Sequence, residues 1–471
     1  MDKRDERNTA PREGARRPGF RARRERAQKK KEEPLSAREV ARRALTDVAR
    51  SGSYVSAALD RHLNTTHLSA DDKRLAASLF FTAVENRLLL EARLSGFWTE
   101  RPEPVVEDIL HIAAAQILLM DKIPDHAAVD EAVKQTRASG RDGLSALVNG
   151  ILRNLIRARD AGELAEITDP AVRYSVAPEL AKRLFDAYGE EEAEKIMADR
   201  PRPSQTIRFN AMKTDAEGFE NYLKAHDVIF ERGLVPGAYR CPAAGNLARL
   251  DGFRNGYFSI QGESSMLAAL AVEPRPGMNV LDACAAPGGK SALIAETMAD
   301  VGRVYAWDVH EHRVELIRAA KQRLRLDSLR PAVRDARKPY ADFDFYMDAV
   351  LVDAPCSGLG VIADKPDIKY RFTDAQLESL LPLQAEILEN CARFVRVGGL
   401  LVYSTCTILP EENEQQVRAF LERHPEFVPE TSADYLPEPL RCRCADGMAQ
   451  FLSHRDHVEG FFIARMRRKG V

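Results

Sequence analysis

Two cysteines stand in surroundings that are unusual for a packed thiol. Cys356 lies in the run Asp353-Ala354-Pro355-Cys356-Ser357-Gly358, and Cys406 lies in Tyr403-Ser404-Thr405-Cys406-Thr407. An isolated cysteine is more often a buried, small apolar residue, but each of these follows a β-rich run and has Pro, Gly, Ser or Thr beside it. If the two strands are neighbours, both thiols lie at one edge of a sheet. Lys290 or a cationic cofactor could lower the pKa of a thiol there and make it a nucleophile.

The run Val280 to Ser291, with the sequence VLDACAAPGGKS, leaves a predicted strand, crosses a tight turn and opens a helix. Its two glycines permit close backbone approach, and the helix start offers unpaired N–H groups to an anionic group. The run is not GxGxxG, and it is not a P-loop because a cysteine takes the place of the first glycine. We therefore expect another kind of cofactor to contact this turn, at Cys284, Ala285, Ala286, Pro287, Gly288, Gly289 and Lys290.

Three carboxylates are predicted at the same edge of the sheet. Asp308, Asp335 and Asp353 each close a predicted strand, although any one alone could equally be a helix cap. Asp308 is suited to accept ribose hydroxyls, Asp335 to accept an adenine amino group and Asp353 to face a cation. Together they describe S-adenosylmethionine, which is the predicted cofactor. Arg313, in the helix after Asp308, is included in the predicted cofactor site.

The segments that carry these residues alternate between β-rich runs and helical stripes from about Gly256 onward. This alternation predicts a doubly wound parallel sheet, a Rossmann-like α/β domain over residues 256–470. The expected strands are 279–283, 303–308, 332–335, 349–353 and 400–405, with helices that end near 298, 324 and 395.

Three further segments precede this domain. Residues 36–160 show helical stripes without strand signals and predict an all-α domain. Residues 165–255 predict a small α+β connector with strands at 205–210 and 228–230 and a helix at 216–225. Residues 1–35 carry 13 Lys/Arg against 7 Asp/Glu, so we expect a disordered basic tail that is either simply solvated or contacts phosphates.

A chain of 471 residues with a net charge of −2 fits a multidomain globular protein. No stretch reaches the roughly 18 apolar residues of a membrane span, and the start lacks the apolar segment of a signal peptide, so we expect a cytoplasmic protein without membrane contact. Seven cysteines in such a chain argue against a disulfide framework. The spacing of Cys442, Cys444, His454 and His457 is poor for zinc, so no metal is expected.

The runs 282–290, 353–358 and 404–406 resemble the motifs of the RNA cytosine-C5 methyltransferases of the Nop2/Sun class. The helical segment resembles the antiterminator NusB at 126–133 and 148–153. The pairing is similar to that of bacterial enzymes that act on small-subunit (16S) ribosomal RNA. The resemblance implies S-adenosylmethionine as cofactor, RNA as partner and an RNA-binding role for the helical domain. We also expect a monomer.

The resemblance further implies roles for single residues. Because C5 of cytosine is a poor nucleophile, a thiolate must first add to C6. That attack is assigned to Cys406, and Cys356 assists removal of the C5 proton and release of Cys406. Asp353 is assigned hydrogen bonds to N3 and the amino edge of the base, a role that competes with facing a cation, and both stay open. Arg208 and Lys369-Tyr370-Arg371 are expected either to contact RNA phosphates or to form a solvated surface.

Other classes of protein fit less well. A nicotinamide-dependent oxidoreductase shares the doubly wound sheet but calls for GxGxxG. An adenine amino-group methyltransferase carries Asn/Asp-Pro-Pro-aromatic where 353–356 stands and needs no thiol. A protein that only binds RNA requires neither the acids nor the thiols. The sequence departs from the family pattern at Glu459, where Asp is usual before Gly-Phe-Phe, which puts the local loop in doubt but not the chemistry.

Overall fold

The computed structural model describes residues 35–51, 55–200, 204–242, 245–362 and 365–470. The predicted basic tail lies outside these ranges, except for its last residue. The chain forms two compact units, one of Met1–Ala83 with Trp98–Ile156 and one of Val84–Phe97 with Arg157–Val471. The division into four segments at the predicted boundaries stays a prediction. None of the helices in the described ranges is long and apolar enough to cross a membrane.

The first unit is built from helices wherever it is described, as the apolar stripes predict. Its central helix, α6 (Pro104–Leu119), is buried at every position from Val106 to Ile117. The stripe of α2, at Val40, Ala44, Leu45 and Val48, is buried as well, because an amphipathic helix is stabilised mainly by packing of its apolar face. The other helices are α3 (Val55–Asn64), α4 (Ala70–Glu85), α7 (Asp125–Ala138), η1 (Asp142–Leu144) and α8 (Ser145–Asp160), and α2 spans Ala37–Ser51.

The second unit opens with α5 (Arg87–Ser95), α9 (Pro170–Arg173) and α10 (Pro178–Ala198), followed by a small antiparallel sheet in the order β2-β3-β1-β4. Aromatic side chains, among them Phe219, Tyr239 and Phe258, fill the core between this sheet and α11. The elements are β1 (Ser204–Phe209), α11 (Ala216–Ala225), β2 (Glu231–Arg232), β3 (Ala238–Pro242), η2 (Leu247–Arg249), α12 (Asp251–Arg254) and β4 (Phe258–Ile260).

A nine-stranded sheet follows, in the order β11-β12-β13-β9-β8-β5-β6-β7, with β10 paired to β13. Strands β7, β6, β5, β8 and β9 are parallel, and the remaining pairs are antiparallel. The strands are β5 (Asn279–Asp282), β6 (Arg303–Asp308), β7 (Leu329–Val333), β8 (Met347–Asp353), β9 (Val395–Thr405), β10 (Phe427–Pro429), β11 (Cys444–Ala445), β12 (Met448–Phe451) and β13 (Phe461–Arg468).

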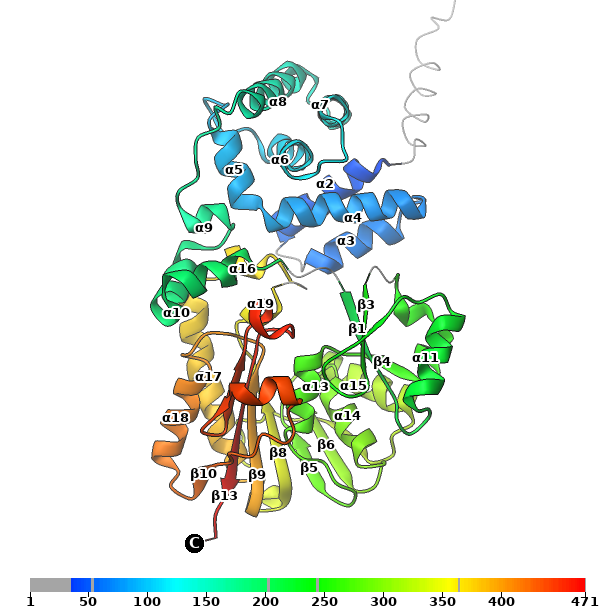
Figure 1. The fold of residues 1–471 in the computed structure, drawn as a ribbon, viewed down its shortest axis with the longest axis vertical. Coiled ribbons are helices and arrows are strands. Elements are labelled where there is room, and N and C mark those ends of the chain that lie inside the picture. The colour runs from blue at the N-terminus through cyan, green and yellow to red at the C-terminus, as the bar shows by residue number, and fades with distance from the viewer. Residues whose placement is uncertain (1–34, 52–54, 201–203, 243–244, 363–364, 471) are drawn as a thin grey trace, which may run out of the picture. The chain divides into compact units, whose positions relative to one another are not determined.

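Helices cover both faces of this sheet (Figure 1). Alternate residues of β8 serve the two cores: Ala349 and Leu351 pack with α13, α14 and α15, while Val350 and Val352 pack with α17 and α18. This period of two explains the continuous apolar runs of the central strands. The helices are α13 (Glu263–Leu270), α14 (Gly289–Thr297), α15 (Glu311–Leu324), η3 (Ala341–Phe343), η4 (Leu359–Val361), α16 (Ile368–Arg371), α17 (Asp374–Ala392), α18 (Glu414–Arg423), η5 (Glu438–Arg443) and α19 (Ser453–Asp456).

The Rossmann-like α/β fold is confirmed. Two expectations about the strands of its sheet, and one about a strand of the connector, were wrong. The sheet is mixed and not wholly parallel, because the nine residues between β12 and β13 are too few for a parallel crossover. The third strand, β7, ends at Val333, so Asp335 lies in the following loop. In the connector, residues 228–230 are not a strand, and the short β2 begins at Glu231.

Candidate active site

The two thiols meet at the carboxyl edge of the sheet. β8 and β9 are parallel neighbours with Asp353 opposite Ser404, so the loops that follow them begin side by side. Sγ of Cys356 lies 3.3 Å from Sγ of Cys406, and both side chains are partly exposed. The structure thus brings together two residues that stand 50 positions apart in the sequence.

The hydrogen bond between the thiols makes them unequal. It lowers the pKa of Cys406, against burial and Asp353, and Lys290 and Lys365 act in the same lowering direction. The same hydrogen bond, together with burial, raises the pKa of Cys356 well above its ordinary value. Of the two thiols, Cys406 is therefore the one more readily ionised and Cys356 the one less readily ionised.

An ion pair lies beside the thiols. Nζ of Lys290 is 2.7 Å from Oδ2 of Asp353, and the Ser404 hydroxyl donates to Oδ1 at 2.8 Å. Burial acts to lower the pKa of Lys290, but Asp353 and Asp282 more than offset it, so the pKa is raised and the ammonium stays charged. The cation that faces Asp353 in this structure is thus the ammonium group of Lys290, which follows the two glycines of the turn.

The glycine turn joins β5 to α14, as predicted. Gly288 has φ +102°, and a Cβ there would lie 3.3 Å from Cα of Ile317 in α15, so this close helix contact requires glycine. Ser291 donates to Oδ2 of Asp282 at 2.6 Å, and burial raises the pKa of Asp282 to about 7. Burial also raises the pKa of Cys284 well above its ordinary value, so this third thiol is poorly suited to attack.

The predicted cofactor acids lie along the same edge. Asp308 is 3% exposed; it accepts a hydrogen bond from the main chain of His310 and pairs with Arg313 at 3.2 Å. Arg313 also donates to the carbonyl of Ala286 at 3.1 Å, so it ties Asp308 to the glycine turn. Asp335 pairs with Arg337, whose hydrogen bond lowers the pKa of that carboxyl group.

This set of donors and acceptors fits S-adenosylmethionine. A buried carboxylate at the end of β6 suits ribose hydroxyls, a further carboxylate beyond β7 suits an amino group, and the start of α14 offers main-chain N–H groups. All of these groups come from one edge of one sheet, where ligands of open α/β sheets bind.

Sequence reasoning missed the polar network behind the thiols. Both oxygens of Glu412 accept hydrogen bonds from Ser357, which follows Cys356. The hydroxyls of Ser357 and Thr407 lie 2.8 Å apart. The signal available was the Glu-Glu-Asn-Glu run after β9, which resembles a solvated surface when only its composition is considered.

The loop before β13, which contains Gly460, also lies against the loops of the two thiols. The N–H of Gly460 donates to the carbonyl of Gly360, and the N–H of Gly360 donates to the carbonyl of Cys406. A Cβ on Gly360 would lie 1.8 Å from the carbonyl oxygen of Gly460, so neither loop tolerates a side chain at this contact. Glu459, the departure from the family pattern, accepts a hydrogen bond from the N–H of Ser264 at the start of α13.

Two basic residues expected at the surface are buried. Arg208 is 1% exposed and pairs with Glu296, and Lys369 is 2% exposed and donates to the carbonyl of Tyr174. Both side chains are almost fully buried, so both expectations for them, RNA phosphates or a solvated surface, were wrong. Among the residues that the structure describes, no group of three or more His, Cys, Asp or Glu is placed to hold a metal ion, and His454 pairs instead with Glu192.

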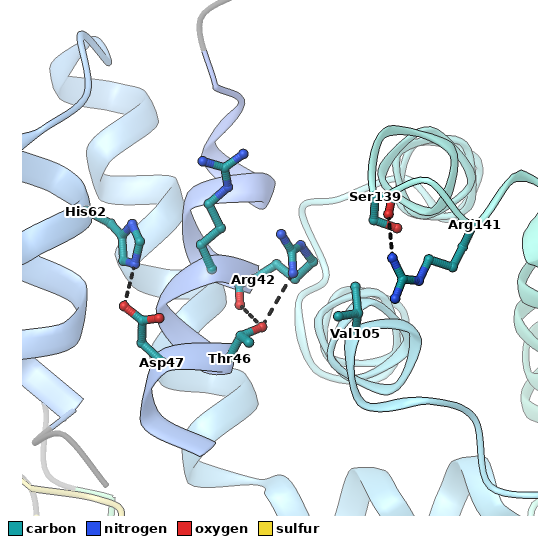
Figure 2. Close-up of a pocket in the computed structure, with 8 residues that line it drawn as sticks. Arg42, Thr46, Asp47, His62, Val105, Ser139 and Arg141 are labelled. Carbon is teal, nitrogen blue, oxygen red and sulfur yellow. Dashed lines mark hydrogen bonds and ion pairs between the residues drawn. The ribbon is translucent and has the colours of Figure 1, made fainter. Parts of the chain in front are cut away.

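The helical unit has a pocket rich in arginine (Figure 2). Arg42 and Arg43 both pair with Glu39, and Arg141 pairs with Glu103. Each of these arginines therefore has an acidic partner, and Arg42 and Arg43 share theirs. The residues that line the pocket are Arg42, Arg43, Thr46, Asp47, His62, Val105, Ser139 and Arg141.

A Rossmann-like sheet with this glycine turn and this rim of acids defines a methyltransferase that uses S-adenosylmethionine. A model of the family described as 16S rRNA methyltransferase RsmB/F matches residues 269–467, and a model of the NusB family matches residues 35–157. The chain belongs to the RsmB/F family and is an S-adenosylmethionine-dependent ribosomal RNA methyltransferase.

Individual proteins agree with this assignment. The probable ribosomal RNA small subunit methyltransferase B of Bacillus subtilis is 39% identical over 445 residues, which cover 92% of this chain and 99% of the relative. The protein of the same description from Synechocystis is 34% identical, with 92% and 100% covered. The crystal structure of PH0851 has a TM-score of 0.76 at 25% identity and covers 93% of this chain and 100% of its own. The structure of NSun6 from Pyrococcus horikoshii with SFG shares the fold, with a TM-score of 0.57 at 24% identity over 62% of this chain and 98% of its own.

Proposed function

We propose that the protein methylates C5 of cytosine in small-subunit ribosomal RNA through a covalent bond between Cys406 and C6 of the base. The observation that carries this proposal is the pair of thiols 3.3 Å apart beside Lys290 and Asp353. Methyl transfer to an amino group or a hydroxyl has no use for a thiolate, whereas a carbon that is a poor nucleophile has to be activated by one.

Each thiol has its own task in this reaction. Cys406 adds to C6 as a thiolate, and the electron density pushed onto C5 makes that carbon nucleophilic. S-adenosylmethionine, when bound, supplies the methyl group as an electrophile. Cys356 assists loss of the C5 proton, whose bonding electrons re-form the C5–C6 double bond and expel Cys406. The lowered pKa of Cys406 supports its role as the nucleophile.

Asp353 is proposed to accept a hydrogen bond from the amino edge of the cytosine, and from N3 once that nitrogen carries a proton. Its carboxyl group accepts hydrogen bonds from Lys290 and Ser404, which hold it in one orientation before the base binds. The competing role, facing the cofactor's cation, is weakened because Lys290 supplies a cation at 2.7 Å.

The proposed cofactor contacts follow the glycine turn and the acids of the rim. Asp308 is held for the ribose, and Arg313 keeps it beside the turn. The full proposed set is Cys284, Ala285, Ala286, Pro287, Gly288, Gly289, Lys290, Asp308, Arg313, Asp335 and Asp353. The enzyme is proposed to act as a monomer.

The helical domain is proposed to bind the RNA substrate, together with the basic tail. Its pocket places three arginines near one another, although each has an acidic partner. Phosphates are expected to compete with Glu39 and Glu103 for these arginines, which favours salt-sensitive binding.

Nucleotide mapping tests the proposal. The purified protein is incubated with 16S RNA or small subunits and labelled S-adenosylmethionine, and the RNA is digested and examined by mass spectrometry. We expect 5-methylcytosine at a defined position. A methyl group on a nitrogen, on a ribose oxygen or on another base would refute C5 chemistry.

A further inference from the structure

Glu412 is a fully buried acidic residue in the loop between β9 and α18. Burial of a carboxyl group is costly unless its oxygens receive hydrogen bonds. Within the described residues, its side chain is held by hydrogen bonds and makes no ion pair with a Lys, Arg or His. The hydrogen bonds of this carboxyl group offset its loss of hydration. The residues that donate them therefore indicate which parts of the structure Glu412 holds in place.

Its partners are Ser357, in the loop of the other thiol, and Gln384, in α17. Oε1 accepts from the N–H of Ser357 at 2.9 Å and from the Gln384 side chain at 3.0 Å, and Oε2 accepts from the Ser357 hydroxyl at 2.5 Å. Gln384 also donates to the carbonyl of Pro355 at 3.0 Å. Two residues that flank Cys356, at 355 and 357, are therefore fastened through Glu412.

The other end of the connection belongs to Cys406. Thr407, the residue after Cys406, has its hydroxyl 2.8 Å from that of Ser357. Because the Ser357 hydroxyl donates to Glu412, it accepts from Thr407. The carbonyl of Glu412 accepts from the hydroxyl of Tyr403 in β9 at 2.7 Å, which anchors the loop to the strand that carries Cys406.

We propose that Glu412 is a positioning residue that holds the loop of Cys356 against the loop of Cys406, so that the two thiols meet. It acts through its hydrogen bonds to Ser357 and Gln384. The proposal rests on the proposed function only for its kinetic consequence, since the placement of the thiols can be measured without RNA. Support comes from the pKa of Cys356, which Glu412 helps to raise after the larger effects of Cys406 and burial.

Phenylarsine oxide tests whether the two thiols lie close enough to bind one arsenic atom. Its arsenic forms two As–S bonds with a pair of close thiols and releases water, and it binds single thiols weakly. Because Cys442 and Cys444 offer a second pair, the measurements use the full chain with Cys442→Ser and Cys444→Ser. Loss of the three side-chain hydrogen bonds of Glu412 in Glu412→Ala is expected to weaken arsenical binding by about tenfold or more.

Three variants serve as controls. Glu412→Gln keeps the shape and the Oε1 acceptor, so it is expected to restore binding to within about threefold of the parent. Asp348→Ala removes a hydrogen bond to the N–H of Asn279 and an ion pair with Arg396 at the opposite edge of the sheet, and it is expected to leave arsenical affinity unchanged. Cys356→Ala is expected to abolish tight binding.

The RNA reaction gives a second readout. If Glu412 acts by placing Cys356, Glu412→Ala should slow release of covalently attached RNA, and adding it to Cys356→Ala should slow release no further. A merely structural defect would add its effect to that of Cys356→Ala and would also weaken cofactor binding.

The outcomes separate the two proposals. Unchanged arsenical affinity in folded Glu412→Ala overturns the positioning role, whatever RNA does. A tenfold loss of affinity without any RNA adduct in Cys356→Ala supports the positioning role and refutes the release role of Cys356. Should Glu412→Ala fail to fold, Ser357→Ala, which removes the hydroxyl arm and keeps the main-chain arm, is expected to weaken binding by about threefold; no change there also overturns the proposal.

Discussion

Nζ of Lys290 lies 2.7 Å from Oδ2 of Asp353, and this contact joins the glycine turn after β5 to the end of β8. The same ammonium lowers the pKa of Cys406. One side chain thus connects the loop proposed to hold the cofactor, the carboxyl group proposed to hold the base and the proposed nucleophile. Substitution of Lys290 is therefore expected to affect the cofactor loop, Asp353 and Cys406.

Lys290→Gln is expected to raise the pKa of Cys406, because loss of a positive charge disfavours the thiolate. The pH at which alkylation of Cys406 reaches half its maximal rate should therefore move upward. The measurement is the rate of iodoacetamide labelling of the Cys406 peptide against pH, read by mass spectrometry. Lys195→Gln, an exposed lysine of α10, serves as the control. An unchanged or lower midpoint in Lys290→Gln contradicts the electrostatic role.

Cys406→Ala is expected to abolish methyl transfer and leave cofactor binding intact, since the thiol faces the base in the proposed reaction. Cofactor affinity is measured by calorimetry and turnover by transfer of a labelled methyl group. Turnover near the wild-type rate would show that another group attacks the base.

Cys356→Ala is expected to attack and methylate but to release slowly, so protein should accumulate in covalent attachment to RNA. A denaturing gel with labelled RNA shows the adduct, and nuclease digestion confirms its RNA content. The double variant with Cys406→Ala should form none, because nothing is trapped without the first addition. An adduct that appears in Cys406→Ala and not in Cys356→Ala means that the two roles are reversed.

Asp308→Ala is expected to weaken cofactor binding more than RNA binding. Loss of charged hydrogen bonds to ribose costs about 1.5 to 3 kcal/mol, which is one to two decades in Kd. Calorimetry with S-adenosylmethionine measures the change, and Asp348→Ala at the opposite edge of the sheet is the matched control. Equal cofactor affinity in Asp308→Ala and the wild type would remove this residue from the site.

Deletion of residues 1–34 is expected to reduce the dependence of RNA binding on salt, because the deleted segment carries 13 Lys/Arg and each phosphate contact adds to the slope. Binding is measured over a range of salt concentrations. If the slope of log Kd against log salt is identical with and without the segment, the tail makes no phosphate contacts.

The sequence predicts best where local pattern and fold agree. The β6 and β8 runs end on Asp308 and Asp353, and their place at one edge follows from the direction of parallel strands. The position of Asp335 was predicted less well. Pro331 interrupts the strand pattern of β7, which is an edge strand, where proline is tolerated. Burial of Arg208 and Glu412 was not foreseen, since it depends on Glu296, Ser357 and Gln384, which lie far away in the sequence.

The position of β13 has a consequence for the growing chain. It lies between β9 and β12 in the sheet, yet it follows both in the sequence, so a ribosome completes both neighbours before the strand that separates them. Until β13 arrives, β9 is an open edge with apolar residues on both faces, and such edges pair readily with other chains. Gly460 lies just before β13, so its hydrogen bond to Gly360, which in turn bonds to Cys406, forms in the same late step. Until that strand joins the sheet, the nascent chain therefore exposes an edge that favours aggregation, and its catalytic edge is complete only afterwards.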